Sequence, residues 1–492
     1  MHRVAIAACL ILGLGELQTV QGSGKIPITT RSEPARALFL RARALNEALQ
    51  PHEAHALFQQ AVAHDSSFAM AEYYLASTAP TANEASGHLQ RALALAPRVS
   101  AGERLMILGL EARTHADRAR ARQIAESLVV QYPEDERAHF VLGTVYSAQH
   151  LYDRTIAQYQ RAITIDPGYS LAYNQLGYAF RSAGNLAAAE TSFRKYIALV
   201  PNDPNPYDSY AELLMKMGRF DESIAQYRKA LAIDPHFGGS HVGIAADHMF
   251  SGRYAAAIAE LDAYDRAARN DNERRTMLLN EAMVYVDKGA TDSAVAALRR
   301  SMGIARAGAD TINMSADEIA IGDVLLEAGR VDAARERYVH AHDLVAASHL
   351  APGVRQDDAL ARHYDLARVA LAHHDLATAR SEAAAYVSGA MAGGNDARVR
   401  QAHELNGLTL LEAKQIDASL GELALADQEN PAVMYAMARA HAGHGATEKA
   451  REMSAQAARM NILPTLPYVF TRAAIAAATR SATSDSAGGR PR

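Results

Sequence analysis

The stretch AYNQLGYAFRSAGNLAAAETSFRKYIALVP, residues 172–201, decides the fold. Apolar and aromatic residues three or four positions apart mark two successive helical faces, made by Tyr173, Leu176, Phe180, Ala189, Phe193 and Tyr196. Gly184 separates the two faces, and Pro201 stops the second helix because proline cannot continue a helical hydrogen-bond ladder. The stretch therefore predicts two helices joined by a tight turn.

The same unit returns along the chain with a fixed period. Prolines that end helical runs recur every 34 residues, at Pro133, Pro167, Pro201 and Pro235. A single pair of helices cannot bury its apolar face alone, so such units must stack on their neighbours. The period therefore predicts an array of helix pairs rather than one globular core.

The repeating residues resemble the tetratricopeptide repeat, whose pattern is W-x2-L-G-x2-Y, then A-x3-F, then P. In the first-quoted unit the matching residues are Tyr173, Leu176, Gly177, Phe180, Ala189, Phe193 and Pro201. One repeat earlier they are His139, Leu142, Gly143, Tyr146, Ala162 and Pro167. The resemblance implies an all-α, right-handed α-α superhelix of about twelve helix pairs plus a C-terminal capping helix.

The template extends outward from the clearest repeats, at residues 102–235, to cover roughly residues 35–464. It places the first helices of successive pairs near Ala35, Ala69, Gly102, Glu136, Ser170, Pro204 and Gly238. The second unit is short by about three residues. Small residues at Gly177 and Ala189 are expected where the two helices of a pair cross, since only small side chains allow close approach.

The repeats lengthen toward the C-terminus, where turn positions fall at Gly289, Gly329, His374 and Lys414. This change suggests an N-terminal array at 35–271 and a C-terminal array of longer repeats at 272–464. The flanking segments are a signal peptide at 1–22, an extended lead-in at 23–34, the capping helix at 465–480 and a disordered tail at 481–492.

The N-terminus indicates export. Arg3 precedes an apolar run at residues 4–14, which is too short to span a bilayer but suits a signal sequence. The apolar run continues beyond Cys9, so a lipoprotein site is not expected, and cleavage after Gly22 would leave no cysteine. We expect a bacterial protein that is periplasmic or secreted, with a cytoplasmic location as the alternative.

Composition and motifs narrow the function class. The net charge is −5 and no long Lys/Arg run occurs, so neither a nucleic-acid surface nor an anionic membrane surface is indicated. The 20 histidines show no metal-ligand spacing, and no phosphate loop, dinucleotide motif or nucleophile motif is present. Asp208 and Glu212 lie one helical turn apart, and we expect them to be solvated or paired with a neighbouring Arg or Lys rather than to act as an acid/base pair. We expect no enzyme activity, no cofactor and no metal.

In the family resembled, the first helices line a concave groove that holds partner peptides. The inward positions of this chain are then Arg137, Phe140, Thr144, Asn174, Tyr178, Arg181, Asp208, Glu212, Met215 and Met249. This mixture of aromatic, amide, charged and adaptable methionine side chains suits an extended peptide. The two-carboxylate clamp of chaperone-binding members is absent, because its position holds Phe140, Asn174 and Asp208.

The sequence therefore predicts a non-catalytic scaffold that binds an extended peptide or a partner helix in the groove. The alternative is a regulatory or sensor module that binds a small molecule among residues 275–430, in an apolar pocket with a few polar groups. A third reading, an enzyme with a site between repeats, would need clustered, strongly shifted acids or histidines. The partner is unnamed by the sequence, no membrane span is expected, and a homodimer stays open.

Overall fold

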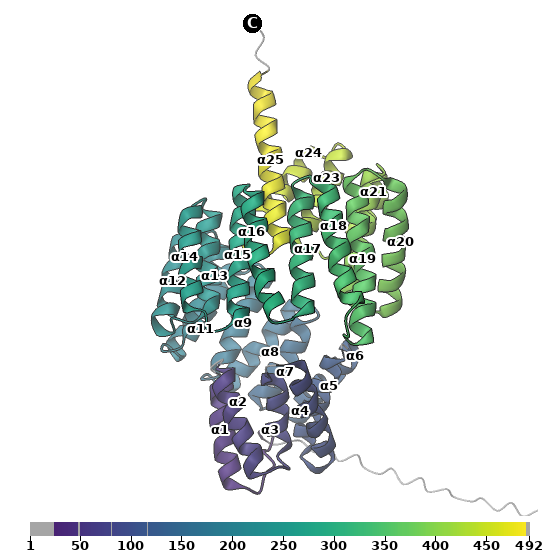
Figure 1. Ribbon diagram of the computed structural model, residues 1–492. Coiled ribbons are helices and arrows are strands. Elements are labelled where there is room, and N and C mark those ends of the chain that lie inside the picture. The colour runs from purple at the N-terminus through teal and green to yellow at the C-terminus, as the bar shows by residue number, and fades with distance from the viewer. Residues whose placement is uncertain (1–23, 48–49, 80, 116, 489–492) are drawn as a thin grey trace, which may run out of the picture. The chain divides into compact units, whose positions relative to one another are not determined.

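The computed structural model describes residues 24–47, 50–79, 81–115 and 117–488. The described chain is made of helices and turns, without a strand, and divides into two compact units, Met1–Pro201 and Asn202–Arg492 (Figure 1). The predicted signal peptide lies outside the described residues, so export stays a prediction.

The N-terminal unit contains five helix pairs. Their bounds are α1 Glu33–Glu47, α2 Pro51–His64, α3 Ala69–Thr78, α4 Ala82–Leu95, α5 Ala101–Thr114, α6 Arg118–Gln131, α7 Glu136–Ser147, α8 Tyr152–Ile165, α9 Ser170–Ser182 and α10 Leu186–Leu199. A short 3-10 turn, η1 at Ala96–Arg98, follows α4.

The C-terminal unit contains seven further pairs and one final helix. The pairs are α11 Pro204–Lys216, α12 Phe220–Ile233, α13 Gly238–Phe250, α14 Tyr254–Ala267, α15 Asp271–Lys288, α16 Thr291–Ala307, α17 Thr311–Glu327, α18 Val331–Ala346, α19 Pro352–Ala372, α20 Leu376–Gly393, α21 Asp396–Glu412, α22 Ile416–Leu423, α23 Pro431–Gly443 and α24 Thr447–Ala458. The final helix is α25, Leu466–Gly488.

The predicted all-α fold of stacked helix pairs is confirmed. Within the described residues each odd-numbered helix from α1 to α23 packs against the even-numbered helix that follows it, which gives twelve pairs plus α25. The first helices α3, α7, α9, α11 and α13 begin at the residues that the repeat template placed there. Local sequence signals therefore position the pairs.

Second helices end two residues before the periodic prolines. Helix α8 ends at Ile165 before Pro167, and α10 ends at Leu199 before Pro201. Proline disfavours helical geometry in the residue that precedes it, so the boundary falls there. The next first helix then begins at a side-chain cap in several pairs, as at Asp135, whose carboxylate accepts from the backbone of α7.

Turns between the helices of a pair use left-handed backbone geometry at one position. Gly289 and Gly329 have φ values of 80° and 73°, while His374 and Lys414 adopt φ values of 56° and 59° at the corresponding turns. Left-handed geometry is unfavourable for residues with a Cβ atom. The turn geometry is thus kept even where glycine is absent.

The helices of a pair approach closely at the small residues. A Cβ atom added to Gly177 would lie 2.7 Å from the ring of Phe193, and Ala189 is fully buried. Gly143 faces Tyr159 in the same way, at 2.6 Å. The predicted role of these small residues at the helix crossing is confirmed.

A polar contact, here called a clasp, joins the two helices of several pairs at the position that tryptophan holds in the resembled pattern. In three pairs a histidine of the first helix lies near a glutamate nineteen residues later, at His241–Glu260 (2.6 Å), His363–Glu382 (2.6 Å) and His403–Glu422 (2.8 Å). The polarity is reversed at Glu281–Arg300 (3.0 Å) and Glu318–Arg337 (3.3 Å). Several of the chain's histidines thus serve contacts within a helix pair.

Two boundaries differ from the sequence-based division. The two units separate at Pro201–Asn202. At the predicted boundary, residues 271–272, α14 packs against α15, because the longer repeats stack on the shorter ones. Helix α25 begins at Leu466, close to the predicted start, but continues to Gly488, into the tail predicted to be disordered. No proline or glycine occurs between Pro467 and that glycine, and extending an existing helix is favourable.

Candidate functional site

The ten predicted groove residues are split between the two units. Six lie on α7 and α9 of the N-terminal unit, namely Arg137, Phe140, Thr144, Asn174, Tyr178 and Arg181. Asp208, Glu212, Met215 and Met249 lie on α11 and α13 of the C-terminal unit. The predicted residues therefore belong to two first-helix surfaces, one in each unit.

On α7, the predicted contact residues are occupied within the chain. Arg137 is buried, donates to Asp135 Oδ2 at 2.5 Å and donates to the backbone oxygen of Ile26 at 2.8 Å. The Phe140 ring lies 5.4 Å from that of Tyr169, and the Thr144 hydroxyl donates to the backbone oxygen of Phe140. Arg137 is thus already bound to a segment far away in the sequence.

On α9, two of the predicted residues form a partly exposed pair. The guanidinium of Arg181 lies 4.6 Å from the centroid of the Tyr178 ring, and that ring meets Phe193 edge-on at 5.1 Å. Asn174, by contrast, is only 3% exposed. Tyr178 and Arg181 therefore form a cation–π pair within the chain, at partly buried positions.

An extended segment, residues 25–30, lies along the N-terminal unit, and we call it the strap. The backbone N–H of Ile26 donates to Asp135 Oδ2 at 2.6 Å, and the backbone N–H of Thr29 donates to Glu103 Oε1 at 2.7 Å. The Thr30 hydroxyl donates to Asp65 Oδ2 at 2.6 Å. The predicted lead-in is thus bound across several repeats.

Sequence reasoning missed the carboxylates that hold the strap. Glu103 stands three residues after Ser100 and forms a capping box with it, and Asp135 caps α7. Although burial acts to raise it, hydrogen bonds from Arg137 and from the Ile26 backbone keep the pKa of Asp135 below its usual value. The S-x-x-E pattern of residues 100–103 predicts the helix cap, but it does not predict that Glu103 also binds the strap.

In the C-terminal unit, helix α25 covers the first helices. It packs against α15, α17 and α23, and also against α24 (Figure 1, yellow). Tyr468 and Val469 are both 0% exposed. Val469 packs in one hydrophobic cluster with Met249 and Met277, and Phe470 packs in a second with Ile321 and Val369. The predicted final helix therefore reaches well beyond the last pair.

Polar contacts hold α25 in one register. Arg472 Nε donates to Asp287 Oδ1 at 3.3 Å, and its guanidinium lies 4.6 Å from the Phe250 ring centroid. The backbone N–H of Asn461 donates to the Tyr468 hydroxyl at 2.8 Å. These contacts specify where the helix sits along the first helices, in addition to the apolar side chains.

The remaining predicted residues of this unit are largely buried. Met215 and Met249 are each 1% exposed, so neither presents an open surface, and α25 contributes to the cluster around Met249. Burial raises the pKa of Asp208 to about 7, and the nearby charge of Glu212 adds to the increase. The Ser240 hydroxyl donates to Asp208 at 2.7 Å, which shows that this carboxyl serves a helix–helix contact.

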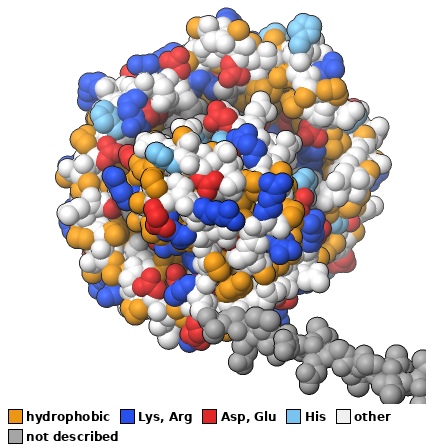
Figure 2. All heavy atoms as spheres, turned by 90° about the horizontal axis from the view of Figure 1, so that it is seen from below, with side chains coloured by type: hydrophobic (Ala, Val, Ile, Leu, Met, Phe, Trp, Pro, Cys, Tyr) orange, Lys and Arg blue, Asp and Glu red, His pale blue; other side chains and the backbone are white. Residues whose placement is uncertain are grey.

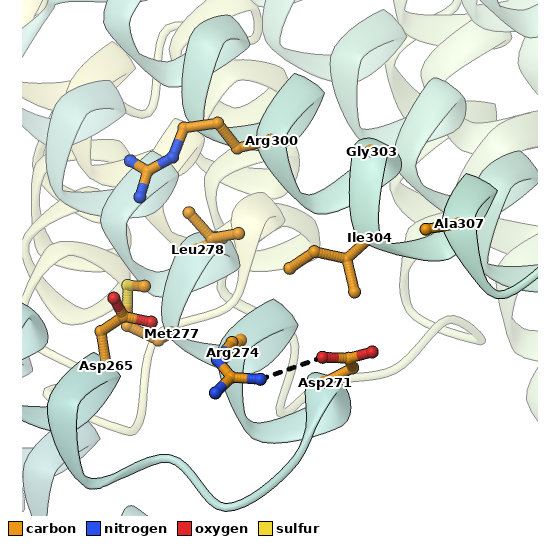
Figure 3. Close-up of a pocket in the computed structure, with 9 residues that line it drawn as sticks. All are labelled: Asp265, Asp271, Arg274, Met277, Leu278, Arg300, Gly303, Ile304 and Ala307. Carbon is orange, nitrogen blue, oxygen red and sulfur yellow. Dashed lines mark hydrogen bonds and ion pairs between the residues drawn. The ribbon is translucent and has the colours of Figure 1, made fainter.

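An open hollow of about 520 Å³ lies beside α15 and α16 (Figure 3). Met277, Leu278 and Ile304 provide its apolar lining. Its two arginines are already paired, Arg274 with Asp271 at 3.0 Å and Arg300 with Glu281 at 3.0 Å. The hollow overlaps the region where the small-molecule alternative was placed, but its cations are neutralised within the chain.

The surface seen from below mixes Lys/Arg and Asp/Glu side chains with hydrophobic ones (Figure 2). Among the described side chains, no three His, Cys, Asp or Glu residues are grouped to hold a metal ion. Within the same part of the chain, no helix has both the length and the hydrophobicity needed to cross a bilayer.

Comparison with protein families identifies the repeating unit. Models described as "Tetratricopeptide repeat" match residues 108–170, 148–204 and 214–281. These stretches are tetratricopeptide repeats. The matched stretches include α7–α10 in the N-terminal unit and α12–α14 in the C-terminal unit. The matched residues include Asp135, which binds the strap, and Met249, which packs in one cluster with Val469 of α25.

Similarity to individual proteins is partial. Anaphase-promoting complex subunit 3 of Schizosaccharomyces pombe (strain 972 / ATCC 24843) is 25% identical over 182 residues, which span 37% of this chain and 27% of that protein. A thermophilic tetratricopeptide repeat protein of Thermus thermophilus, TTC0263, is 21% identical, with a TM-score of 0.29, over 43% of this chain and 98% of that one. PilW, a type IV pilus biogenesis factor, is 19% identical, with a TM-score of 0.35, over 40% and 91%.

Proposed function

We propose that the chain is a non-catalytic scaffold that binds segments of partner proteins along the first helices of its two units. In the C-terminal unit the segment is an amphipathic helix, and in the N-terminal unit it is an extended peptide. The single observation that carries this proposal is α25, which lies against α15, α17 and α23 as a partner helix would.

The side chains of α25 define what the C-terminal surface accepts. Tyr468, Val469 and Phe470 are consecutive and all buried, so the helix is enclosed on more than one side. Arg472 adds one ion pair with Asp287. Helix-in-groove recognition depends on such apolar anchors with a few polar contacts that set the register. A partner helix should therefore carry an aromatic–aliphatic–aromatic triplet with a basic residue two positions after it.

The shifted carboxyl groups support a non-catalytic role. Asp247 is 0% exposed on α13, and Asp208 is buried on α11 against Ser240. A catalytic acid must reach its substrate within hydrogen-bond distance. Both groups are instead enclosed between helices, where burial is the largest cause of their raised pKa values.

The proposal is tested in the full chain by releasing α25 from the surface formed by α15, α17 and α23. Val469→Asp places a charge in a buried apolar cluster and should release the helix. A fluorescent peptide of residues 463–480 should then bind the variant at least tenfold more tightly than it binds the parent, measured by anisotropy. Ala477→Asp, at an exposed position of the same helix, is the matched control and should behave like the parent.

The binding measurement requires that the surface formed by α15, α17 and α23 stays folded in the variant. Circular dichroism should show that the Val469→Asp chain keeps its helix content. A folded variant that does not bind the peptide, or that binds equally a peptide carrying Val469→Asp, would contradict recognition of a helix by this surface.

A further inference from the structure

The strap crosses the repeats of the N-terminal unit in the reverse of chain order. Thr30 contacts Asp65 in the turn before α3, Thr29 contacts Glu103 in the first turn of α5, and Ile26 contacts Asp135 at the start of α7. One short segment therefore bridges three successive first helices at their N-terminal ends.

Main-chain groups of the strap make two of the contacts with acidic side chains and one with a basic side chain. The N–H groups of Ile26 and Thr29 donate to carboxylates, and the Ile26 carbonyl accepts from Arg137. Contacts of this kind recognise an extended backbone with any side chain. The site is thus built to hold an extended chain.

Side chains of the strap add sequence preference. Ile26 is 2% exposed and packs in the core cluster that includes Tyr132. The Thr29 hydroxyl donates to Glu103 Oε2 at 2.5 Å, the Thr30 hydroxyl donates to Asp65, and Lys25 forms an ion pair with Glu136. The pattern read by the site is a basic residue, a branched aliphatic residue, two further residues and two hydroxyl residues.

The receiving carboxylates are ordered by their own helices. Asp135 Oδ1 accepts from the backbone N–H groups of Arg137 and Ala138, and Glu103 Oε2 accepts from the backbone N–H and hydroxyl of Ser100. These bonds do not involve the strap. A preorganised site binds an incoming segment with a smaller entropic cost.

We propose that this line of Asp65, Glu103, Asp135, Glu136 and Arg137 is a recognition site for an extended peptide of a partner protein, and that the strap occupies it in competition. The inference rests on the proposed scaffold function and names the partner class for the N-terminal unit. The partner segment carries the basic–aliphatic–x–x–hydroxyl–hydroxyl pattern of residues 25–30.

The strap has an advantage because it is covalently attached next to the site. A short tether gives an effective concentration on the order of millimolar, so a free peptide competes poorly unless the strap is weakened. Pro27 and Thr29 are exposed and Ile28 is only partly buried, so a single anchor, Ile26, supplies most of the buried apolar contact.

The test uses the full chain with Ile26→Asp, which removes that anchor, and the matched control Pro27→Ala at the adjacent exposed position. The probe is a fluorescent peptide of residues 24–31, GKIPITTR. We expect the Ile26→Asp chain to bind it at least tenfold more tightly than the parent and the control. A peptide with both Ile26→Asp and Thr29→Ala should not bind.

A receptor change locates the binding. Glu103→Gln in the Ile26→Asp chain keeps one acceptor oxygen for the cap but presents an amide N–H group to the Thr29 backbone N–H, so peptide affinity should fall at least tenfold. Unchanged affinity would overturn the proposed site.

Two further results would overturn the proposal. If Ile26→Asp lowers the helix content of the chain, the strap is a structural part of the core and not a competitor. If the folded Ile26→Asp chain binds the probe no better than the parent, the site does not accept a peptide in trans. Neither result bears on the surface that α25 covers, which the Val469→Asp experiment tests in the other unit.

Discussion

His88 on α4 lies 2.6 Å from the carboxylate of Glu72 on α3, sixteen residues earlier. The other clasps join residues nineteen apart, and this pair is the one whose sequence is about three residues shorter than the template. The shortened turn therefore preserves the contact between the two helices. The clasp is a feature of the packed pair rather than of sequence spacing alone.

Breaking a clasp should destabilise its unit. Glu260→Leu removes the partner of His241, whose side chain is largely buried, and leaves the ring Nδ1 unpaired. We expect a loss of about 1–3 kcal/mol in the free energy of unfolding, measured by urea denaturation. The double variant His241→Leu/Glu260→Leu should cost less than the sum of the single changes, and strict additivity would contradict the coupling.

Stability should fall as pH rises because of Asp247. Burial raises the pKa of this carboxyl from 3.8 to about 8, and the effects of Ser223 and Arg253 only partly oppose the increase. The folded state holds the proton more tightly than the unfolded state, so stability is lost as pH rises from about 4 to about 8. Asp247→Asn should be more stable than the parent at pH 8, by a few kcal/mol as an order of magnitude, with little difference at pH 4.

The measurement is the melting temperature of the parent and the Asp247→Asn chain across this pH range. A matched control is Asp417→Asn, since Asp417 is exposed at the start of α22. A parallel pH dependence of the parent and the Asp247→Asn chain would show that another group is responsible.

Relieving left-handed geometry should stabilise the C-terminal unit. Lys414 is exposed and has a φ value of 59°, and glycine adopts this geometry without steric cost. Lys414→Gly should therefore raise the free energy of unfolding by about 1 kcal/mol. Lys414→Val should lower it, because a branched Cβ is strained at this φ, and equal stability of the two variants would contradict the argument.

Filling the helix crossing should be harmful. A Cβ atom at Gly177 would lie 2.7 Å from Phe193, so Gly177→Ala must displace a buried ring. We expect a loss of about 1–3 kcal/mol in thermal or urea unfolding. Gly421→Ala on α22 is the control, since no atom lies within 4 Å of its Cβ position, and it should stabilise by about 0.5–1 kcal/mol through helix propensity.

Local features of the fold were predictable from the sequence. The starts of α7 and α9, the helix ends before Pro167 and Pro201, and the turn at Gly289 all follow from residues within one repeat. Such signals act over a few residues, where proline, glycine and cap chemistry determine backbone geometry. They predict each pair well because each pair is assembled from neighbours in sequence.

The occupied surfaces were not predictable in the same way. The contact of Ile26 with Asp135 and that of Val469 with Met249 join residues far apart in the chain, and neither repeats with the 34-residue period. A template that projects inward positions assumes an open surface. It therefore identified Arg137 and Met249 as inward residues but could not show that Ile26 binds the first and Val469 packs in one cluster with the second.

The clasps have a consequence for how such a chain can grow. Each one closes inside a single helix pair, as at His363–Glu382 or, with reversed charge, at Glu318–Arg337. A duplicated or deleted pair therefore carries both members of its own clasp. Recombination that gains or loses a whole pair therefore leaves every other clasp intact, whereas ion pairs between successive pairs, such as Arg275–Asp317 and Arg368–Asp323, must form anew at the junction.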